Sequence, residues 1–274
     1  MAGQPEIKNM ALFCDFENIA LGVRDAKYAQ FDMQKVLERL LLKGSSIVKK
    51  AYCDWERYKA FKASMHEAAF ELIEIPHVRQ SGKNSADIRL VVDALDLCYT
   101  KAHVDTFVIL SGDADFSPLV SKLRENNKVV IGVGVKQSTA DLLTANCDEF
   151  LFYDDLVREQ EQKKKRAAKH ATGTTPGGAP HKTAKKREPD KRQEAVDMII
   201  ETLEALIAER GVEDKIWGSM VKQALKRRQP GFNESSYGFR SFSELLEEAE
   251  KRQLVALEHD EKSGGYILRM LARG

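Results

Sequence analysis

Two sequence periods alternate along the first 156 residues, and this alternation constrains the fold more than any other feature of the chain. Short runs rich in β-branched and aromatic residues have the composition of strands. These runs are ALFCDF (11–16), IVKKAYC (47–53), ELIEIP (71–76), TFVILSG (106–112), KVVIGVG (128–134) and EFLFYD (149–154). The segments between them carry apolar residues at spacings of three and four, the helical period. The alternation predicts an α/β domain over 1–156, with a mostly parallel sheet and helices on both of its faces.

Local turn signals agree with these boundaries. Asp32 precedes the helical segment MQKVLERLLLK as an N-cap residue, and Gly44 follows that segment as a C-terminal stop. Ser117 and Pro118 have the pattern of a first helical turn. Several strand candidates are continuous apolar runs, which is typical of a sheet buried on both faces.

The composition changes after residue 156. Residues 157–192 begin as a charged helix end and continue as ATGTTPGGAPHKTAKKREPDK, a basic stretch whose Gly, Pro, Thr and Lys cannot build a core. We therefore predict a disordered basic linker there. Residues 193–274 contain three amphipathic helical segments followed by two strand candidates around a Gly-Gly turn. This order predicts a small winged-helix domain at the C-terminus.

Whole-chain properties exclude several classes of protein. Of the 274 residues, 43% are hydrophobic and 31% charged, and no apolar run approaches the roughly 20 residues that span a bilayer. The N-terminus has no secretory signal, so we predict a cytoplasmic protein without a membrane partner. The four cysteines form no C-x-x-C pair, which argues against zinc and predicts reduced thiols. The net charge of +1 excludes no class of partner.

Acidic residues follow two of the predicted strands and open one helix. Asp15 ends the first strand with Asn18 one turn later, and Asp113 and Asp115 follow the fourth strand. Asp87 opens the long helical segment between the third and fourth strands. Because sites in parallel α/β sheets form outside the carboxyl ends of the strands, we expect these side chains to converge on one edge.

Such a cluster of carboxylates needs a cation, because like charges a few ångströms apart raise each other's pKa. Oxygen ligands favour Mg²⁺ or Mn²⁺ over zinc. Ions placed in this way activate water and neutralise charge at a phosphodiester, which is the chemistry of metal-dependent nucleases. The four aspartates, with Asn18 as an orienting residue, therefore form the candidate catalytic and metal site. This chemistry leaves a DNA nuclease and a phosphatase open as alternatives.

Each of these residues also has a purely structural interpretation. Asp15 can cap the loop that follows it, and Asp113 can form an Asx-turn before the helix at Ser117. Ser111 either binds a neighbouring carboxylate or phosphate, or is a turn residue. Asp93 lies four residues after Arg89 on the same helix, so an ion pair between them explains it better than a site role.

The segments ALFCDFENIA, GKNSADIRLVVDAL and FVILSGDADFSPLVSKLRENNKVVIGVG resemble the NYN domain of the LabA-like group, within the PIN-like nuclease superfamily. The resemblance covers about residues 8–155 and implies a PIN-like, three-layer ribonuclease fold that uses Mg²⁺ or Mn²⁺ and acts on RNA. It also implies a role for each matched residue: the metal-binding acids are Asp15, Asp87, Asp113 and Asp115, and Asn18 belongs to the first motif.

The C-terminal segment is similar to the LOTUS domain, also called OST-HTH, through the pattern P-x-F-x-x-x-x-Y-G-F-x-S-F-x-x-L-L that begins at Pro230. The resemblance covers about residues 193–273 and implies a winged helix that binds RNA or protein partners of RNA metabolism. The aromatic residues of this pattern either build the small core, which we favour, or stack on bases. They are Phe232, Tyr237, Phe239 and Phe242.

Basic residues supply a further set of candidates for RNA binding. They either contact phosphates or simply solvate the surface that carries them. They are Lys83 in the first domain and Lys222, Lys226, Arg227, Arg228 and Arg240 in the second.

Taken together, the residues and the resemblances predict a metal-dependent endoribonuclease whose C-terminal module binds RNA or a protein partner. The alternative is a non-catalytic RNA-binding or adaptor protein that keeps the acidic site. The sequence names neither the RNA nor the oligomeric state, and a homo-oligomer stays among the alternatives.

Overall fold

The structure is a computed structural model of the whole chain, and it describes residues 8–75, 85–161, 191–211, 214–229, 231–260 and 265–271. These residues belong to two compact units, one up to residue 161 and one from residue 191. Most of the predicted linker (157–192) lies outside the described residues, as do Lys83 and Pro230. The predicted domain boundaries therefore stay a prediction.

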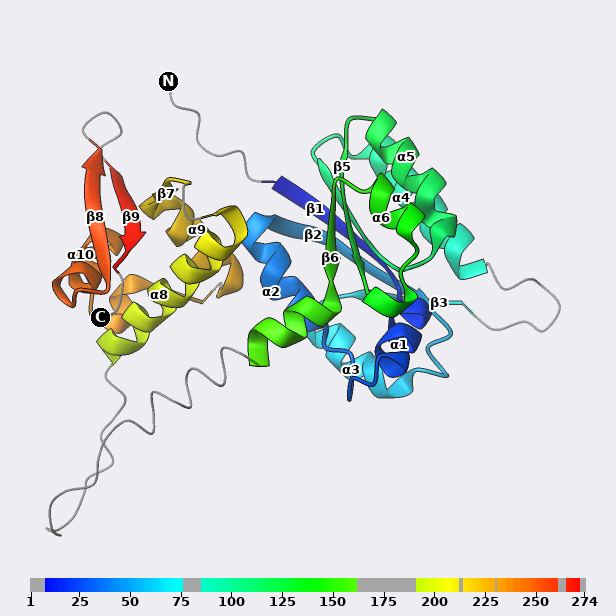
Figure 1. Cartoon of the computed structure of the whole chain (residues 1–274), viewed down its shortest axis with the longest axis horizontal. Helices are drawn as coiled ribbons and strands as arrows, with labels where there is room; N and C mark the ends of the chain where they lie inside the picture. Colours follow the sequence, from blue (N-terminus) through cyan, green and yellow to red (C-terminus); the bar gives the residue numbers. More distant parts are fainter. Residues whose placement is uncertain are drawn as a thin grey trace, which may run out of the picture. The chain divides into compact units, whose positions relative to one another are not determined.

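The described part of the first unit contains a six-stranded sheet in the order β3-β2-β1-β4-β5-β6, and every neighbouring pair is parallel (Figure 1). The strands are β1 (Lys8–Asp15), β2 (Gly44–Cys53), β3 (Glu71–Glu74), β4 (Thr106–Leu110), β5 (Val129–Gly134) and β6 (Glu149–Phe152). The prediction of a mostly parallel sheet is confirmed. The chain adds strands outward from β1 in one direction and then from β4 in the other, so the topological switch point lies between β1 and β4.

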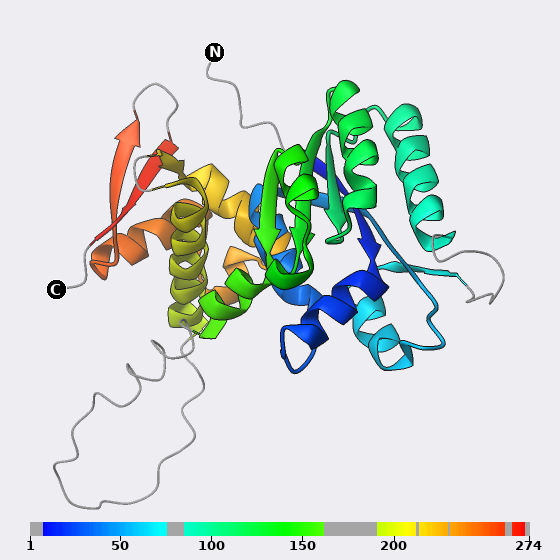
Figure 2. The same ribbon diagram turned by 45° about the vertical axis from the view of Figure 1, so that its right-hand side comes forward.

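Helices cover both faces of this sheet, as predicted (Figures 1 and 2). One face packs against α1 (Phe16–Asp25), α2 (Met33–Lys43), α3 (Lys59–Glu67) and a helix described over 153–161. The other face packs against α4 (Ser85–Thr100), α5 (Ser117–Glu125) and α6 (Asp141–Asn146).

The central strand β1 shows why the strands are continuous apolar runs. Met10, Leu12 and Cys14 point into one core, and Ala11 and Phe13 point into the other. All five are fully buried. Alternate side chains of a strand point to opposite faces, so a sheet with helices on both sides needs apolar residues at every position.

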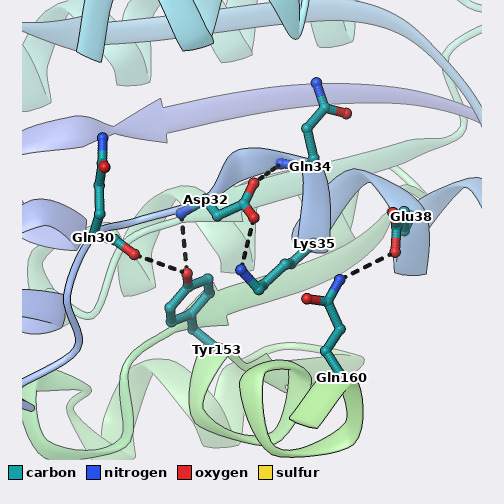
Figure 3. A network of polar contacts seen from close by, with 7 residues as sticks. All are labelled: Gln30, Asp32, Gln34, Lys35, Glu38, Tyr153 and Gln160. Carbon is teal, nitrogen blue, oxygen red and sulfur yellow. Dashed lines mark hydrogen bonds and ion pairs between the residues drawn. The ribbon is translucent and has the colours of Figure 1, made fainter. Parts of the chain in front are cut away.

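A polar network joins the start of α2 to the start of the helix over 153–161, which lie far apart in the sequence (Figure 3). The Tyr153 hydroxyl accepts a hydrogen bond from the backbone N–H of Asp32 (3.0 Å) and donates to the carbonyl of Gln30 (3.3 Å). The Asp32 carboxylate accepts from the backbone N–H of Gln34 (3.0 Å) and pairs with Lys35 (2.7 Å). The predicted N-cap at Asp32 is therefore confirmed. Burial raises the pKa of Tyr153 to about 12, so its hydroxyl stays protonated as the donor.

Gly44 ends α2 as predicted, but for a different physical reason. Its backbone is extended, with φ −177°, and it forms the first residue of β2 beside Lys8. A Cβ at Gly44 would lie 2.3 Å from the carbonyl oxygen of Lys8. Position 44 requires glycine because β1 approaches its backbone closely. Gly44 does not adopt the left-handed conformation that often ends a helix.

The described part of the second unit contains three helices and a three-stranded antiparallel sheet in the order β7-β9-β8. Its elements are α8 (Lys191–Arg210), β7 (Ile216–Trp217), α9 (Gly218–Arg228), α10 (Phe242–Lys251), β8 (Val255–Asp260) and β9 (Gly265–Met270). The predicted winged helix is confirmed. The sequence does not predict β7, because a strand of two residues has no periodicity.

The aromatic residues of the second unit are mostly part of its core. Phe232, Phe239 and Phe242 are buried. Tyr237 is half-buried and stacks on Phe232 with ring centroids 5.3 Å apart. The core interpretation is confirmed for the three phenylalanines.

All four cysteines are free thiols, as predicted: Cys14, Cys53 and Cys98 are buried, and Cys147 is partly buried. Burial raises the pKa of Cys147 to about 11, which keeps its thiol protonated. In the part of the chain that the structure describes, no helix combines the length and the apolar character needed to cross a membrane.

Candidate active site

The candidate site lies at the carboxyl ends of β1 and β4, the two adjacent strands at the switch point (Figure 1). Asp15 is the last residue of β1, and Ser111, Gly112 and Asp113 follow β4 directly. Parallel pairing of β1 with β4 brings these two segments together although they are almost 100 residues apart. The rule that sites form where strand order switches therefore holds for the geometry of this chain.

Ser111 connects the two segments. Its hydroxyl donates a hydrogen bond to Asp15 Oδ2 (3.0 Å) and accepts one from the backbone N–H of Asp113 (3.2 Å). Ser111 and Asp15 are both buried. The hydrogen-bond interpretation of Ser111 is confirmed, and the serine fixes the position of one Asp15 oxygen.

Asn18 makes a second connection across the same gap. Its side-chain oxygen accepts a hydrogen bond from the backbone N–H of Gly112 (2.9 Å). Its own backbone N–H donates to Asp15 Oδ1 (3.3 Å), which makes Asp15 the N-cap of α1. The capping interpretation of Asp15 is thus confirmed, and both of its oxygens accept hydrogen bonds. Asn18 is placed to orient the turn after β4 relative to Asp15.

Asp113 and Asp115 lie in the turn that leads into α5. Asp113 Oδ1 accepts a hydrogen bond from the backbone N–H of Asp115 (2.9 Å) and caps the short 3₁₀ helix Ala114–Phe116. The Asx-turn interpretation of Asp113 is confirmed. Helix α5 begins at Ser117 with a proline in its first turn, as predicted. Asp115 is exposed and Asp113 is half-buried.

Electrostatics link these aspartates to Asp87, which lies half-buried in the first turn of α4. Burial raises the pKa of Asp15 to about 7, and the charges of Asp87 and, less strongly, Asp113 add to this effect. Hydrogen bonds from Asn18 and Ser111 oppose it. Burial also raises the pKa of Asp87, and the charges of Asp113 and Asp115 raise it further. The four carboxylates therefore interact as one acidic cluster, defined by Asp15, Asp87, Asp113 and Asp115.

The chemistry of this acidic cluster fits a hard divalent cation. Its donors are carboxylate oxygens, joined by the hydroxyl of Ser111 and the amide of Asn18, and its raised pKa values mark an excess of negative charge that a cation would neutralise. Within the described ranges, no three His, Cys, Asp or Glu side chains stand close enough to form a ready coordination group. The structure thus gathers the acids electrostatically without drawing them into a formed coordination shell.

Asp93 has a structural role, as the ion-pair interpretation predicted. Its carboxylate accepts hydrogen bonds from Arg89 (3.0 Å), Tyr52 (2.9 Å) and Lys50 (3.2 Å). Burial acts to raise the pKa of Asp93, but the bonds from Tyr52 and Lys50 and the positive charges outweigh it and lower the pKa. Asp93 is therefore a paired carboxylate outside the acidic cluster.

The basic residues of the second unit divide into paired and exposed side chains. Lys222 pairs with Glu234 (2.8 Å), and Arg228 pairs with Glu201 (3.1 Å). Lys226 is exposed on α9. The two other candidates of this unit are Arg227, half-buried, and Arg240, exposed.

Sequence reasoning missed Glu17 as a neighbour of the site. Its negative charge contributes to the raised pKa of Asp87, and its carboxylate pairs with Arg57 at 3.1 Å. Its position in the sequence could have indicated this, because Glu17 comes two residues after Asp15, the residue that ends the first predicted strand. Glu17 adds to the negative charge beside the acidic cluster.

Gly112 is the glycine on which the geometry of the turn depends. A Cβ at this position would lie 2.3 Å from the backbone oxygen of Ser138. Gly112→Ala should therefore destabilise the protein by about 1–3 kcal/mol and lower any activity of the site, because Asp113 follows directly. Thermal unfolding measures the effect, with Gly231→Ala, where a Cβ meets nothing within 4 Å, as the matched control. Equal melting temperatures for the two variants would contradict the packing argument.

An open parallel sheet with an acidic cluster at its switch point, joined to a winged helix, defines a nuclease-like α/β protein with a nucleic-acid-associated module. The chain belongs to the NYN domain family: the NYN family model matches residues 9–154, and the OST-HTH/LOTUS domain model matches residues 191–266. NYN domains are part of the PIN-like nuclease superfamily, whose members generally use divalent metal ions. Both resemblances are confirmed, and the two domains together indicate an RNA-related function.

Two similar proteins match the first unit. An uncharacterised protein of Methanocaldococcus jannaschii is 26% identical over 147 residues, which are 51% of this chain and 56% of that protein. The chain thus spans about half the length of the curated relative it matches. The first unit is also similar to the crystal structure of a protein of unknown function from Vibrio parahaemolyticus, with 25% sequence identity and a TM-score of 0.50. The match covers 56% of this chain and 98% of the Vibrio chain. Its match supports the fold of the first unit.

Proposed function

We propose that the protein is a metal-dependent endoribonuclease that cleaves RNA phosphodiesters. The observation that carries this proposal is the acidic cluster, in which buried Asp15 is held by Ser111 and Asn18 at the switch point of a NYN domain. Asp93 shows the contrasting arrangement, a carboxylate that is paired with cations of the chain. Asp15 and Asp87 instead have raised pKa values, first because of burial and then because of the charges of other carboxylates.

The residues of the acidic cluster would hold Mg²⁺ or Mn²⁺. When bound, such an ion supplies activation of water and neutralisation of charge on a phosphodiester. Ser111 and Asn18 keep Asp15 oriented through bonds to both of its oxygens. Asp115 is exposed, where an RNA backbone can reach it, and Asp113 is half-buried beside it.

The second unit is proposed to raise the local concentration of substrate. Winged-helix units of the LOTUS type are RNA-associated, and exposed Lys226 and Arg240 are available for phosphate contacts. Two modules of modest affinity on one chain bind a common strand more tightly than either alone, provided that the connecting segment spans both sites. A protein partner of the same unit is the alternative use of this module.

The test is cleavage of labelled single-stranded RNA by the full-length chain in Mn²⁺ or Mg²⁺, compared with EDTA. We expect internal cleavage in the presence of either ion and full-length RNA in EDTA. A DNA strand of the same sequence and a phosphomonoester substrate decide between the ribonuclease and its alternatives. RNA left intact under every metal condition would end the endoribonuclease proposal.

The second candidate function is a non-catalytic RNA-binding adaptor. The capping bonds of Asp15 and Asp113 favour it, because each gives the carboxylate a structural use that does not require turnover. A gel-shift measurement on the same RNA distinguishes the two functions. Binding without metal-dependent shortening of the RNA supports the adaptor.

A further inference from the structure

Helix α4 carries an apolar stripe on its outer surface, defined by Ile88, Val92, Leu95 and Tyr99. Three of these large side chains are strongly exposed: Ile88 by 63%, Val92 by 55% and Tyr99 by 64%. Leu95 is half-buried. Figure 2 shows α4 at the outer end of its helical layer, with α5 on its inner side. An exposed apolar stripe of this kind is typical of an interaction surface.

The exposed part of the stripe, Ile88, Val92 and Tyr99, is separate from the face that holds α4 on the sheet. Leu90, Ala94 and Cys98 form that buried face, in a core shared with β1 and β4. The α4 stripe is offset from the buried set by about a third of a turn, and Leu95, at its inner edge, also packs against the core. An open surface hollow beside the stripe is lined by Ser85, Ile88, Arg89, Val92, Asp93 and Asp96. Among the described residues of the first unit, Ile88, Val92 and Tyr99 therefore stay strongly exposed, and the hydroxyl of Tyr99 accepts a hydrogen bond from Asn126 (3.4 Å).

We propose that the α4 stripe binds the same stripe of a second copy of the chain, with the two helices antiparallel about a twofold axis. The spacing of the stripe is four, three and four residues, which is the seam of a coiled coil. This spacing is symmetric about its centre. In an antiparallel pair Ile88 therefore faces Tyr99 of the second copy, and Val92 faces Leu95 of the second copy. A self-complementary patch is what a twofold interface requires.

Charge complementarity supports the same arrangement. Arg89 and Asp96 lie on one side of the α4 stripe and seven residues apart, so both flank the seam at equivalent positions. An antiparallel twofold pair brings Arg89 of each copy, which also pairs with Asp93 of its own helix (3.0 Å), near Asp96 of the other, and this contact occurs twice. Asp96 is exposed, and among the described residues no donor is hydrogen-bonded to its carboxylate. In a parallel pair the flanking positions of the two copies would lie on opposite sides of the seam, so this cross-pairing would not form.

The size of the seam sets the strength of association. Eleven residues of helix rise about 16 Å, so the stripe alone is smaller than the roughly 800 Å² per partner of a standard stable interface. The dimer is therefore reversible and depends on concentration. Asp87 lies one residue before Ile88, so the two acidic clusters lie toward opposite ends of the shared seam.

The first test is sedimentation velocity of the full-length chain over a series of concentrations. We expect the mass of the wild-type protein to rise from one chain toward two, while Val92→Glu stays at one. Leu142→Glu is the matched control, because Leu142 is an equally exposed apolar residue (58%) on α6, outside the stripe. A wild-type chain that remains single at its highest soluble concentration, or a Val92→Glu chain that dimerises as well as the wild type, would overturn the proposal.

The second test is charge reversal, read by the same measurement. Arg89→Asp and Asp96→Arg each place like charges together at the seam and should weaken dimerisation about tenfold. The double variant Arg89→Asp/Asp96→Arg restores opposite charges and should recover the wild-type dissociation constant. Circular dichroism and thermal unfolding verify that each variant is folded. Failure of the double variant to recover would overturn the antiparallel register.

Discussion

Asp113→Asn is expected to abolish metal-dependent cleavage of RNA while the protein stays folded. Asparagine keeps the oxygen that accepts the hydrogen bond from the Asp115 N–H, so the turn into α5 is retained. It removes a negative charge from the acidic cluster, which we propose holds a cation. The transition state then loses several kcal/mol of charge stabilisation. The rate of cleavage should fall by a factor of about 1,000 or more.

The measurement is the initial rate of RNA cleavage in Mn²⁺, with the melting temperature measured on the same preparation. Asp25→Asn is the matched control, because Asp25 is an exposed aspartate at the other end of α1 and pairs only locally with Arg24. We expect the control to cleave at the wild-type rate. Wild-type cleavage by a folded Asp113→Asn protein would refute the site assigned to Asp113.

Asp15→Asn is expected to stabilise the metal-free protein at neutral and alkaline pH. The folded-state pKa of Asp15 is about 7, raised by burial and by the charge of Asp87 from an ordinary value of 3.8. Folding therefore favours the protonated carboxyl. Its contribution to stability is fully present below pH 4 and is lost as the pH rises through 7. Asparagine has no such charge, so above pH 7 the variant should be more stable by up to about 4 kcal/mol.

Thermal unfolding in EDTA between pH 4 and pH 8.5 measures this difference. The melting temperature of Asp15→Asn should exceed that of the wild type by on the order of 10 °C at pH 8, and the gap should close toward pH 4. Mn²⁺ should raise the wild-type melting temperature at pH 8 and raise that of the variant much less. A gap that does not change with pH would show that the Asp15 carboxyl titrates without coupling to folding.

The architecture of the first unit was predictable because its strands and helices have strong periodic signals. Each of the six predicted strands occurs, and Asp32 and Ser117 begin helices as expected. Asp15 and Asp113 could be placed near one another because both end strands that a parallel sheet aligns. The resemblances extended this prediction to the order of the two domains.

Other features depend on tertiary contacts that leave no mark in local sequence. Strand β7 exists only because Ile216 and Trp217 pair with β9. The role of Gly44 follows from the approach of β1, and the raised pKa of Asp15 follows from burial beneath the turn that carries Ser111. Glu17 was missed because an acid next to a motif gives no pattern of its own. Periodicity identifies the elements, whereas the pKa values and close approaches arise only when distant elements meet.

The place of β1 in the middle of the sheet determines when the acidic cluster can exist during synthesis. Asp15 is made early, but its partner Ser111 comes 96 residues later, on the strand that closes the other side of β1. A ribosome-bound chain that ends before β4 has the first aspartate and lacks the serine that positions it, together with Asp113 and Asp115. The nascent protein therefore carries no complete acidic cluster until β4 and the turn after it have been translated.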